Sequence, residues 1–156
     1  MFNSDGLLAG HYVYSLICEE GGPYYIKIGN TNNPIKRLAN ILNGCPVIPR
    51  SLCYVELPTR RVALAIERLM QDDCRKWHQT LEWFRVEPAE FPEFRQACNA
   101  ILKAAGEKGR PPLQWTTINV RELVSAGQRR QWGWRRAVAR RGKPYKDFLR
   151  DVRRLG

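Results

Sequence analysis

The first half of the chain contains side chains whose chemistry suits the cleavage of phosphate esters. They are Tyr12, Tyr14, Tyr25, Lys27, Arg37 and Glu67. Tyr12 and Tyr14 alternate along one segment, and the second pair, Tyr25 and Lys27, alternates along the next. Each pair shares one face if both segments are strands. Phosphodiester hydrolysis needs a group that takes a proton from water, cations that balance the phosphorane charge, and a carboxylate that holds a metal ion.

Glu67 lies where a carboxylate could be half-buried. It flanks the apolar stripe of a predicted helix, one turn from Ala63 and Met70, and can point toward the segments that carry the tyrosines. A half-buried carboxylate needs compensation, and a divalent cation supplies it. The position of Glu67 therefore predicts a metal ligand.

These side chains also have purely structural interpretations. Tyr14 could be an ordinary aromatic residue of a sheet. Lys27 could be a solvated lysine that protects an edge strand from aggregation. Arg37 and Glu67 could form an ion pair between two helices.

Alternating strands and helices must position this set. Residues 11–18 and 24–29 are rich in β-branched and aromatic types and predict a β-hairpin. Asn32–Pro34 predicts the start of a helix that ends near Gly44. Further strands are predicted at 52–57 and 83–86 and helices at 59–77 and 91–105, the first with a buried stripe of Val62, Ile66, Leu69, Met70 and Trp77. This order predicts an α+β fold with a small antiparallel or mixed sheet flanked by helices.

Taken in order, these motifs resemble those of the GIY-YIG nuclease superfamily. Tyr12-Val13-Tyr14 corresponds to the first motif and Lys27-Ile28-Gly29 to the second. Arg37 lies in an N-P-x-x-R-L segment, Glu67 follows on the long helix, and E-W-F ends at Phe84. The resemblance covers about residues 10–87, and this short form looks most like the branch common in bacteriophages and mobile elements.

The resemblance implies a metal-dependent endonuclease. Tyr14 would assist the nucleophilic water, and Arg37 would stabilise the scissile phosphate. Glu67 would bind one Mg²⁺ or Mn²⁺ ion. Lys27 stands where most members have a second tyrosine and would act as a second cation or orient the water.

The sequence departs from the family pattern at three positions. Tyr12 stands at the place of a glycine, and Ile41 at the place of a histidine found in many members. Glu82 lies near the position where an asparagine is often found. These departures leave open a catalytically inactive nucleic-acid- or protein-binding module on the same scaffold, such as a phage factor acting on a host complex. A third alternative is a nucleic-acid-binding regulator whose hairpin resemblance is coincidental.

Positive charge is concentrated at the C-terminal end. The whole chain has 26 Lys+Arg and 15 Asp+Glu residues, a net charge of +11. Residues 110–156 contain 13 of the basic residues and only three acidic ones, whereas residues 1–109 are nearly neutral. We therefore predict a nuclease-like domain at 1–109 and, after the proline pair at 111–112, a mainly helical basic extension at 110–156.

The basic extension is predicted to bind nucleic acid, either DNA or RNA. The residues expected to contact phosphates are Arg129, Arg130, Arg135, Arg136, Arg140, Arg141, Lys143 and Lys146. An amphipathic helix at 144–155 could instead dock on a protein partner or lie on a membrane surface.

Composition restricts the remaining classes of protein. A length of 156 residues with 44% hydrophobic residues is enough for one core and excludes a wholly disordered chain. No uncharged run is long or apolar enough to span a bilayer, and no secretory signal is predicted. Scattered cysteines, five in number, favour a reducing, cytoplasmic location. A zinc site at Cys74 and His78, completed by Cys45 and Cys53, is a weaker alternative.

Overall fold

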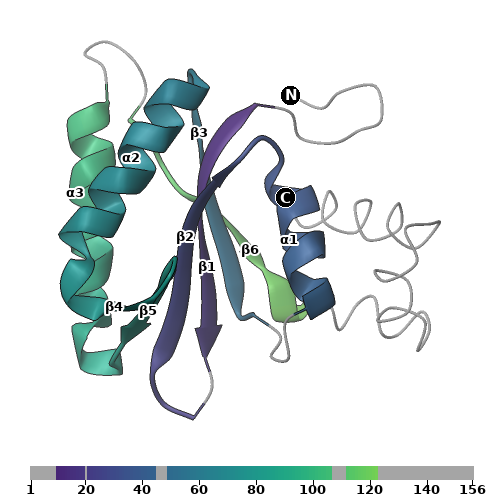
Figure 1. Ribbon diagram of the computed structural model, residues 1–156, viewed down its shortest axis with the longest axis vertical. Coiled ribbons are helices and arrows are strands. Elements are labelled where there is room, and N and C mark those ends of the chain that lie inside the picture. Colours follow the sequence, from purple (N-terminus) through teal and green to yellow (C-terminus); the bar gives the residue numbers. More distant parts are fainter. Residues whose placement is uncertain (1–9, 20, 45–48, 107–111, 123–156) are drawn as a thin grey trace.

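An antiparallel sheet of six strands lies at the centre of the computed structural model, which describes residues 10–19, 21–44, 49–106 and 112–122. The strand order is β4-β5-β2-β1-β3-β6 (Figure 1). The strands are β1 (His11–Glu19), β2 (Tyr24–Thr31), β3 (Ser51–Leu57), β4 (His78–Thr80), β5 (Trp83–Val86) and β6 (Thr116–Asn119).

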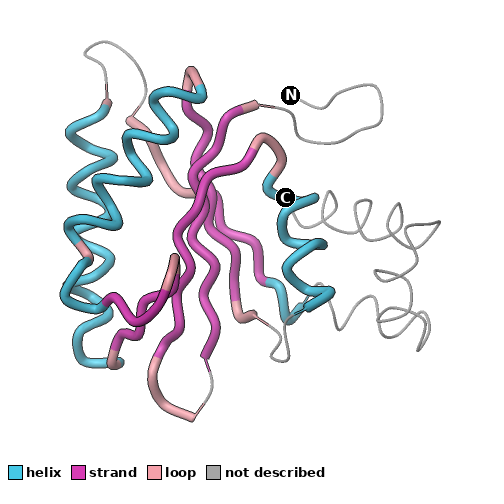
Figure 2. Tube along the Cα trace, viewed as in Figure 1, coloured by secondary structure: helices cyan, strands magenta, loops and turns pink. Residues whose placement is uncertain are grey.

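Helices cover both faces of the sheet. On one face lies α1 (Pro34–Gly44), and on the other lie α2 (Arg60–Asp73) and α3 (Phe91–Ala105), side by side (Figures 1 and 2). Short 3₁₀ helices, η1 (Arg75–Trp77) and η2 (Pro88–Glu90), precede β4 and α3. The predicted α+β class, with a small sheet flanked by helices, is confirmed.

Alternation along β1 divides the apolar residues between two cores. Val13 and Ile17 face α2 and α3, where they pack with residues such as Ile66 and Phe94. Tyr14 and Leu16 face α1 and pack with its apolar side. The sheet therefore separates two layers of side chains, and a residue's position along its strand decides which layer it joins.

The helix starts follow the capping signals in the sequence. The side-chain oxygen of Asn33 accepts a hydrogen bond of 3.0 Å from the backbone N–H of Lys36, and Pro34 is the first residue of α1. Thr59 accepts a bond of 3.2 Å from the N–H of Val62 at the start of α2. Both predicted helix starts are confirmed.

The structure corrects the prediction for the long helix. It ends at Asp73, and Trp77 belongs to the separate η1. Leu69, predicted in the buried stripe, is 51% exposed, because the inward face of α2 carries Ala63 and Glu67 beside its other buried residues. The stripe is therefore shifted toward the side of the helix that contains the carboxylate.

Two strands are found that the sequence analysis does not predict. The first, β4, is a short and fully exposed strand beside β5. The second, β6, pairs with β3 from residues after the proline pair, so the sheet includes part of the predicted extension. The amphipathic helix predicted at 144–155 lies outside the described residues. Within the described ranges, none of the helices has the length and apolarity that a bilayer span requires.

The register of the β1–β2 hairpin places Tyr14 opposite Gly29. The phenol ring lies so close to Gly29 that a Cβ atom there would be 2.6 Å from the Tyr14 hydroxyl and 2.8 Å from its ring. Both residues are buried, so the ring has little room to move. A side chain at position 29 would have to displace the tyrosine.

We therefore expect Gly29→Ala to lower the free energy of unfolding by about 1–3 kcal/mol, the usual cost of overpacking a core. Urea denaturation followed by circular dichroism measures this change. The control is Gly106→Ala, where the new Cβ would be 3.4 Å from its nearest neighbour, a backbone oxygen. Equal stability of the two variants would contradict the close packing of Tyr14 on Gly29.

Candidate functional site at the open edge of β2

The candidate site surrounds a stretch of β2 that β5 leaves uncovered. Pairing between the two strands ends at Lys27 and Trp83, and no described strand lies along β2 residues Ile28–Thr31 on that side. We call this stretch the β2 edge. Its first residue is held from two directions: the N–H of Ile28 donates to the backbone oxygen of Glu82 at 3.3 Å, and its carbonyl accepts from Gln71 at 3.3 Å.

On the α1 face of the sheet, Arg37 contacts Tyr14. The Nε–H of Arg37 donates a hydrogen bond of 3.1 Å to the phenol oxygen of Tyr14. This bond raises the pKa of Arg37 against the opposing effect of burial, and the charge of Glu82 raises it further. Arg37 is therefore a fixed cation at every pH at which the protein is folded.

Lys27 lies on this same face and forms an ion pair with Glu82. The Lys27 side chain is only 13% exposed, and its ammonium group lies 5.6 Å from the centre of the Trp83 ring. Because the charge of Glu82 acts on both Lys27 and Arg37, the two cations are linked through one carboxylate. The α1 face thus carries a phenol, a guanidinium and an ammonium near the β2 edge.

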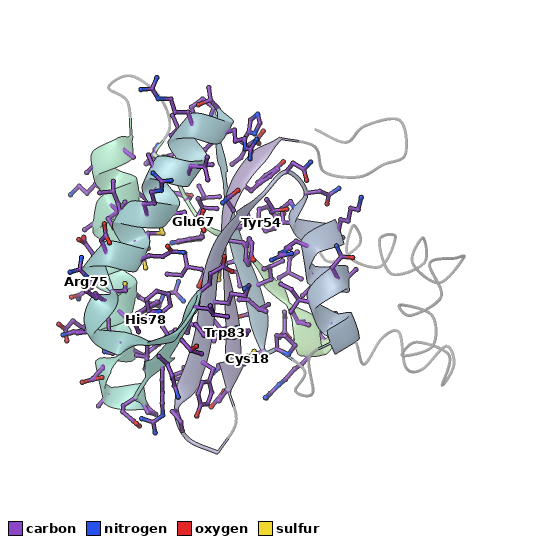
Figure 3. The ribbon with its side chains drawn as sticks, viewed as in Figure 1. Cys18, Tyr54, Glu67, Arg75, His78 and Trp83 are labelled. Carbon is purple, nitrogen blue, oxygen red and sulfur yellow. The ribbon has the colours of Figure 1, made fainter. Side chains whose placement is uncertain are left out.

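Glu67 approaches the β2 edge from the opposite face. Its residue is 7% exposed, and its carboxylate accepts hydrogen bonds from the side-chain amides of Asn30 and Gln71, the latter at 3.2 Å. In Figure 3, Glu67 lies on the α2 side of the strands and Tyr54, the β3 partner of Tyr14, on the α1 side. No described cation pairs with Glu67, so its charge is met only by neutral amides.

The structural alternative of an ion pair between Arg37 and Glu67 is wrong. Arg37 bonds to Tyr14 and Glu67 bonds to two amides, and the sheet lies between them. At the β2 edge, Gln71 links Glu67 to the backbone of Ile28, and Glu82 links the same backbone to Lys27. The predicted side chains therefore lie on both sides of a single strand rather than on one surface.

The other two tyrosines are placed differently. Tyr12 lies two residues before Tyr14 on the same face; its hydroxyl is buried without a hydrogen-bond partner among the described residues. Burial, and next the charge of Glu56, raises the pKa of Tyr12. Tyr25 pairs with Cys18, about 13 Å along β2 from the residue opposite Tyr14 at ~3.3 Å per residue. The register therefore does not bring Tyr25 to the phenol and guanidinium.

Asn30 and Gln71 are the site residues that the sequence analysis misses. Each contacts Glu67, and both signals were available in the sequence. Asn30 directly follows the Lys27-Ile28-Gly29 motif, and Gln71 lies four residues after Glu67, the spacing that brings two side chains together on a helix. The amides hold the carboxylate at the edge.

The zinc alternative finds no support in the described residues, where no group of three or more His, Cys, Asp or Glu side chains gathers. The Cys74 sulfur instead lies 3.9 Å from the Cys98 sulfur in the core. That contact lowers the pKa of the Cys74 thiol, and together with burial it raises that of Cys98. His78 is exposed and bonds to the backbone oxygen of Leu81. Cys45 lies outside the described residues, as do the predicted nucleic-acid-binding residues from Arg129 to Lys146.

Comparison with known proteins places this architecture in a family. The model of the T5orf172 domain matches residues 11–100, from the start of β1 to α3. The chain belongs to the T5orf172 domain family. This domain is related to the GIY-YIG/HNH-like phage nuclease-associated domain, and it suggests a nuclease-like or DNA-binding module. Searches of curated proteins and of solved structures gave no match.

The different surroundings of Tyr14 and Tyr12 lead to opposite expectations for removal of the hydroxyl. Tyr14→Phe loses a hydrogen bond to a charged group and should lower the free energy of unfolding by about 1–3 kcal/mol. Tyr12→Phe removes a buried hydroxyl without a partner and should leave stability unchanged or raise it by up to about 1 kcal/mol. Urea denaturation at pH 7 measures both.

The pH dependence of Tyr12→Phe gives an independent check. The Tyr12 pKa is raised above the ordinary value of 10.0, so the unfolded chain loses this proton before the folded chain does. Stability is then unaffected below that pH and falls above it. Tyr12→Phe should lose less stability than the parent protein above pH 10, and an identical decline would contradict the burial of this hydroxyl.

Proposed function

We propose that the protein is a metal-dependent endonuclease that hydrolyses phosphodiester bonds in DNA. The observation that carries the proposal is the arrangement at the β2 edge. Arg37, Lys27 and the phenol of Tyr14 lie on one side of this strand, and the buried carboxylate of Glu67 lies on the other. Membership of a nuclease-associated family supports the same conclusion.

The residues present fit a hard divalent cation such as Mg²⁺ or Mn²⁺. Glu67 is a buried carboxylate without a described cation partner, and such a charge calls for compensation. The side-chain oxygen of Asn30 could become a second ligand if its amide rotates. Magnesium sites commonly use one or two carboxylates and complete their shell with water and substrate phosphate. When bound, the ion would neutralise phosphate charge and activate water.

The chain's own residues would perform the remaining tasks. Arg37 uses one N–H for Tyr14 and keeps the others for a phosphate oxygen. The Tyr14 oxygen accepts that bond, and its own O–H would orient the attacking water. Lys27, held by Glu82, would supply the second cation as charge builds up on the phosphorane.

Plasmid nicking tests the proposal directly. With Mg²⁺ or Mn²⁺, the protein should nick or cut supercoiled plasmid or single-stranded DNA, and EDTA should abolish the activity. Glu67→Gln and Arg37→Ala should each reduce the rate by about 10²-fold or more, the usual effect of removing one stabilising group.

Matched controls separate the site from general effects of charge. Glu93→Gln and Arg75→Ala make the same changes at exposed positions and should cleave at the parental rate. Equal activity of the site variants and the parent would refute the assignment. DNA binding without cleavage, under every metal and substrate tried, would instead favour the alternative of a catalytically inactive binding module.

The basic extension is proposed to hold the DNA. A chain that ends at Glu122 keeps β6 but lacks the predicted contacts from Arg129 to Lys146. It should bind a labelled duplex more weakly, and its affinity should depend less on salt, because fewer counterions are released. Fluorescence anisotropy at several salt concentrations measures both quantities, and circular dichroism checks the fold. Unchanged affinity and salt slope would refute this role.

A further inference from the structure

The outer side of α2 carries arginines that form no ion pair with the described residues. Arg60, Arg61 and Arg68 are exposed, and with Leu64 and Ala65 they line a shallow depression of about 550 Å³. We call these five residues the α2 basic face. None of its three arginines forms an ion pair with a carboxylate in the described part of the chain. Their guanidinium groups are therefore available to an external anion.

Several other exposed cations of the domain are paired with carboxylates, whereas Lys36, Arg95 and Lys103 are exposed and form no ion pair among the described residues. Arg50 pairs with Glu19, and Arg85 pairs with Glu87. Arg75 and Lys76 likewise pair with acidic neighbours. In a domain whose total charge is close to zero, the α2 basic face thus differs from these single cations because three unpaired arginines line one depression.

The position of this face relative to Glu67 follows from helix geometry. Successive residues of an α-helix are rotated by about 100°. Starting from Glu67, the next residues around the helix are Arg60, Gln71 and Leu64, followed by Arg68 and Arg61 within about 120°. The apolar stripe lies on the other side of Glu67. The basic face therefore begins beside the carboxylate, on the flank that Gln71 directs toward the β2 edge.

We propose that the α2 basic face binds the sugar-phosphate backbone of DNA and guides it to the β2 edge. Guiding rests on the proposed nuclease function, whereas binding can be measured without it. Arg60 and Arg68 are about 12 Å apart along the helix axis at 1.5 Å per residue, long enough for contacts with more than one phosphate. Leu64 is the only large apolar side chain of the face, too little for insertion into a membrane.

The test compares two full-length variants that lose the same charge. One is Arg60→Ala/Arg61→Ala/Arg68→Ala, and the other is Lys76→Ala/Arg95→Ala/Lys103→Ala. The control residues are exposed and lie on η1 and α3. Binding of a fluorescent duplex is measured by anisotropy in EDTA across a salt series, so that cleavage cannot interfere.

The α2 variant should bind about tenfold or more weakly than the control at low salt. The slope of log K against log salt should become shallower by about 2 to 3 for it alone, since each phosphate contact contributes ~0.9. Equal binding by the two variants would overturn the proposal. The proposal would also be overturned if the α2 variant bound DNA normally but bound anionic phospholipid vesicles more weakly than the control variant. That result would assign the face to a membrane.

Further variants separate this proposal from folding and from the nuclease assignment. Lysines at positions 60, 61 and 68 preserve the charge and should retain most of the binding, whereas an alanine-like loss in a folded protein would overturn a role based on phosphate attraction. If the α2 variant loses binding but the parent protein does not cleave DNA, DNA binding by the α2 basic face is upheld and the nuclease function is refuted. If the parent cleaves DNA but the α2 variant binds as tightly as the control variant, the nuclease function is upheld and DNA binding by the face is refuted.

Discussion

The contact between Tyr14 and Gly29 is the constraint on which the candidate site depends. Without a side chain at position 29, the phenol ring lies against the backbone of the neighbouring strand. Its oxygen then reaches the guanidinium of Arg37, and this bond, together with the burial of Ile35 and Leu38, fixes α1 over the hairpin. One cross-strand pair therefore sets the position of a helix and the placement of its cation.

Glu67 shows how a helix can carry a charge inside a core. Two amides satisfy its oxygens, and one of them, Gln71, also bonds to the backbone of β2. The amides solvate the carboxylate but do not neutralise it, which is costly unless a cation is available. A structural ion pair would have removed this charge. In the proposed function, a bound ion beside the open strand edge would compensate this charge.

Strong local signals made most of the fold predictable. Alternating aromatic and β-branched residues identify the hairpin, and the Asn33-Pro34 pair identifies the start of α1. The strands β4 and β6 are short and mostly exposed, so no apolar pattern identifies them. The distribution of the site over two faces depends on register: Gly29 and Asn30 are neighbours, yet they point to opposite sides of the sheet. Alternation within β2 gives that relation, but which helix covers each side does not follow from a single segment.

β5 begins at Trp83, opposite Lys27, and in the proposed function this start decides how a substrate could use both faces. The backbone of β2 stands between Glu67 and the pair of Arg37 and Tyr14, so one phosphate can approach both only by lying across the β2 edge. If β5 also paired with β2 beyond Lys27, it would cover the β2 edge. The side chains on each face of the sheet would then be separated from those on the other face. The backbone of Glu82 ends that pairing with a bond to Ile28, while its side chain holds Lys27. In the proposed mechanism, Glu82 therefore marks the limit of the pairing between β5 and β2 and also positions Lys27 beside the β2 edge.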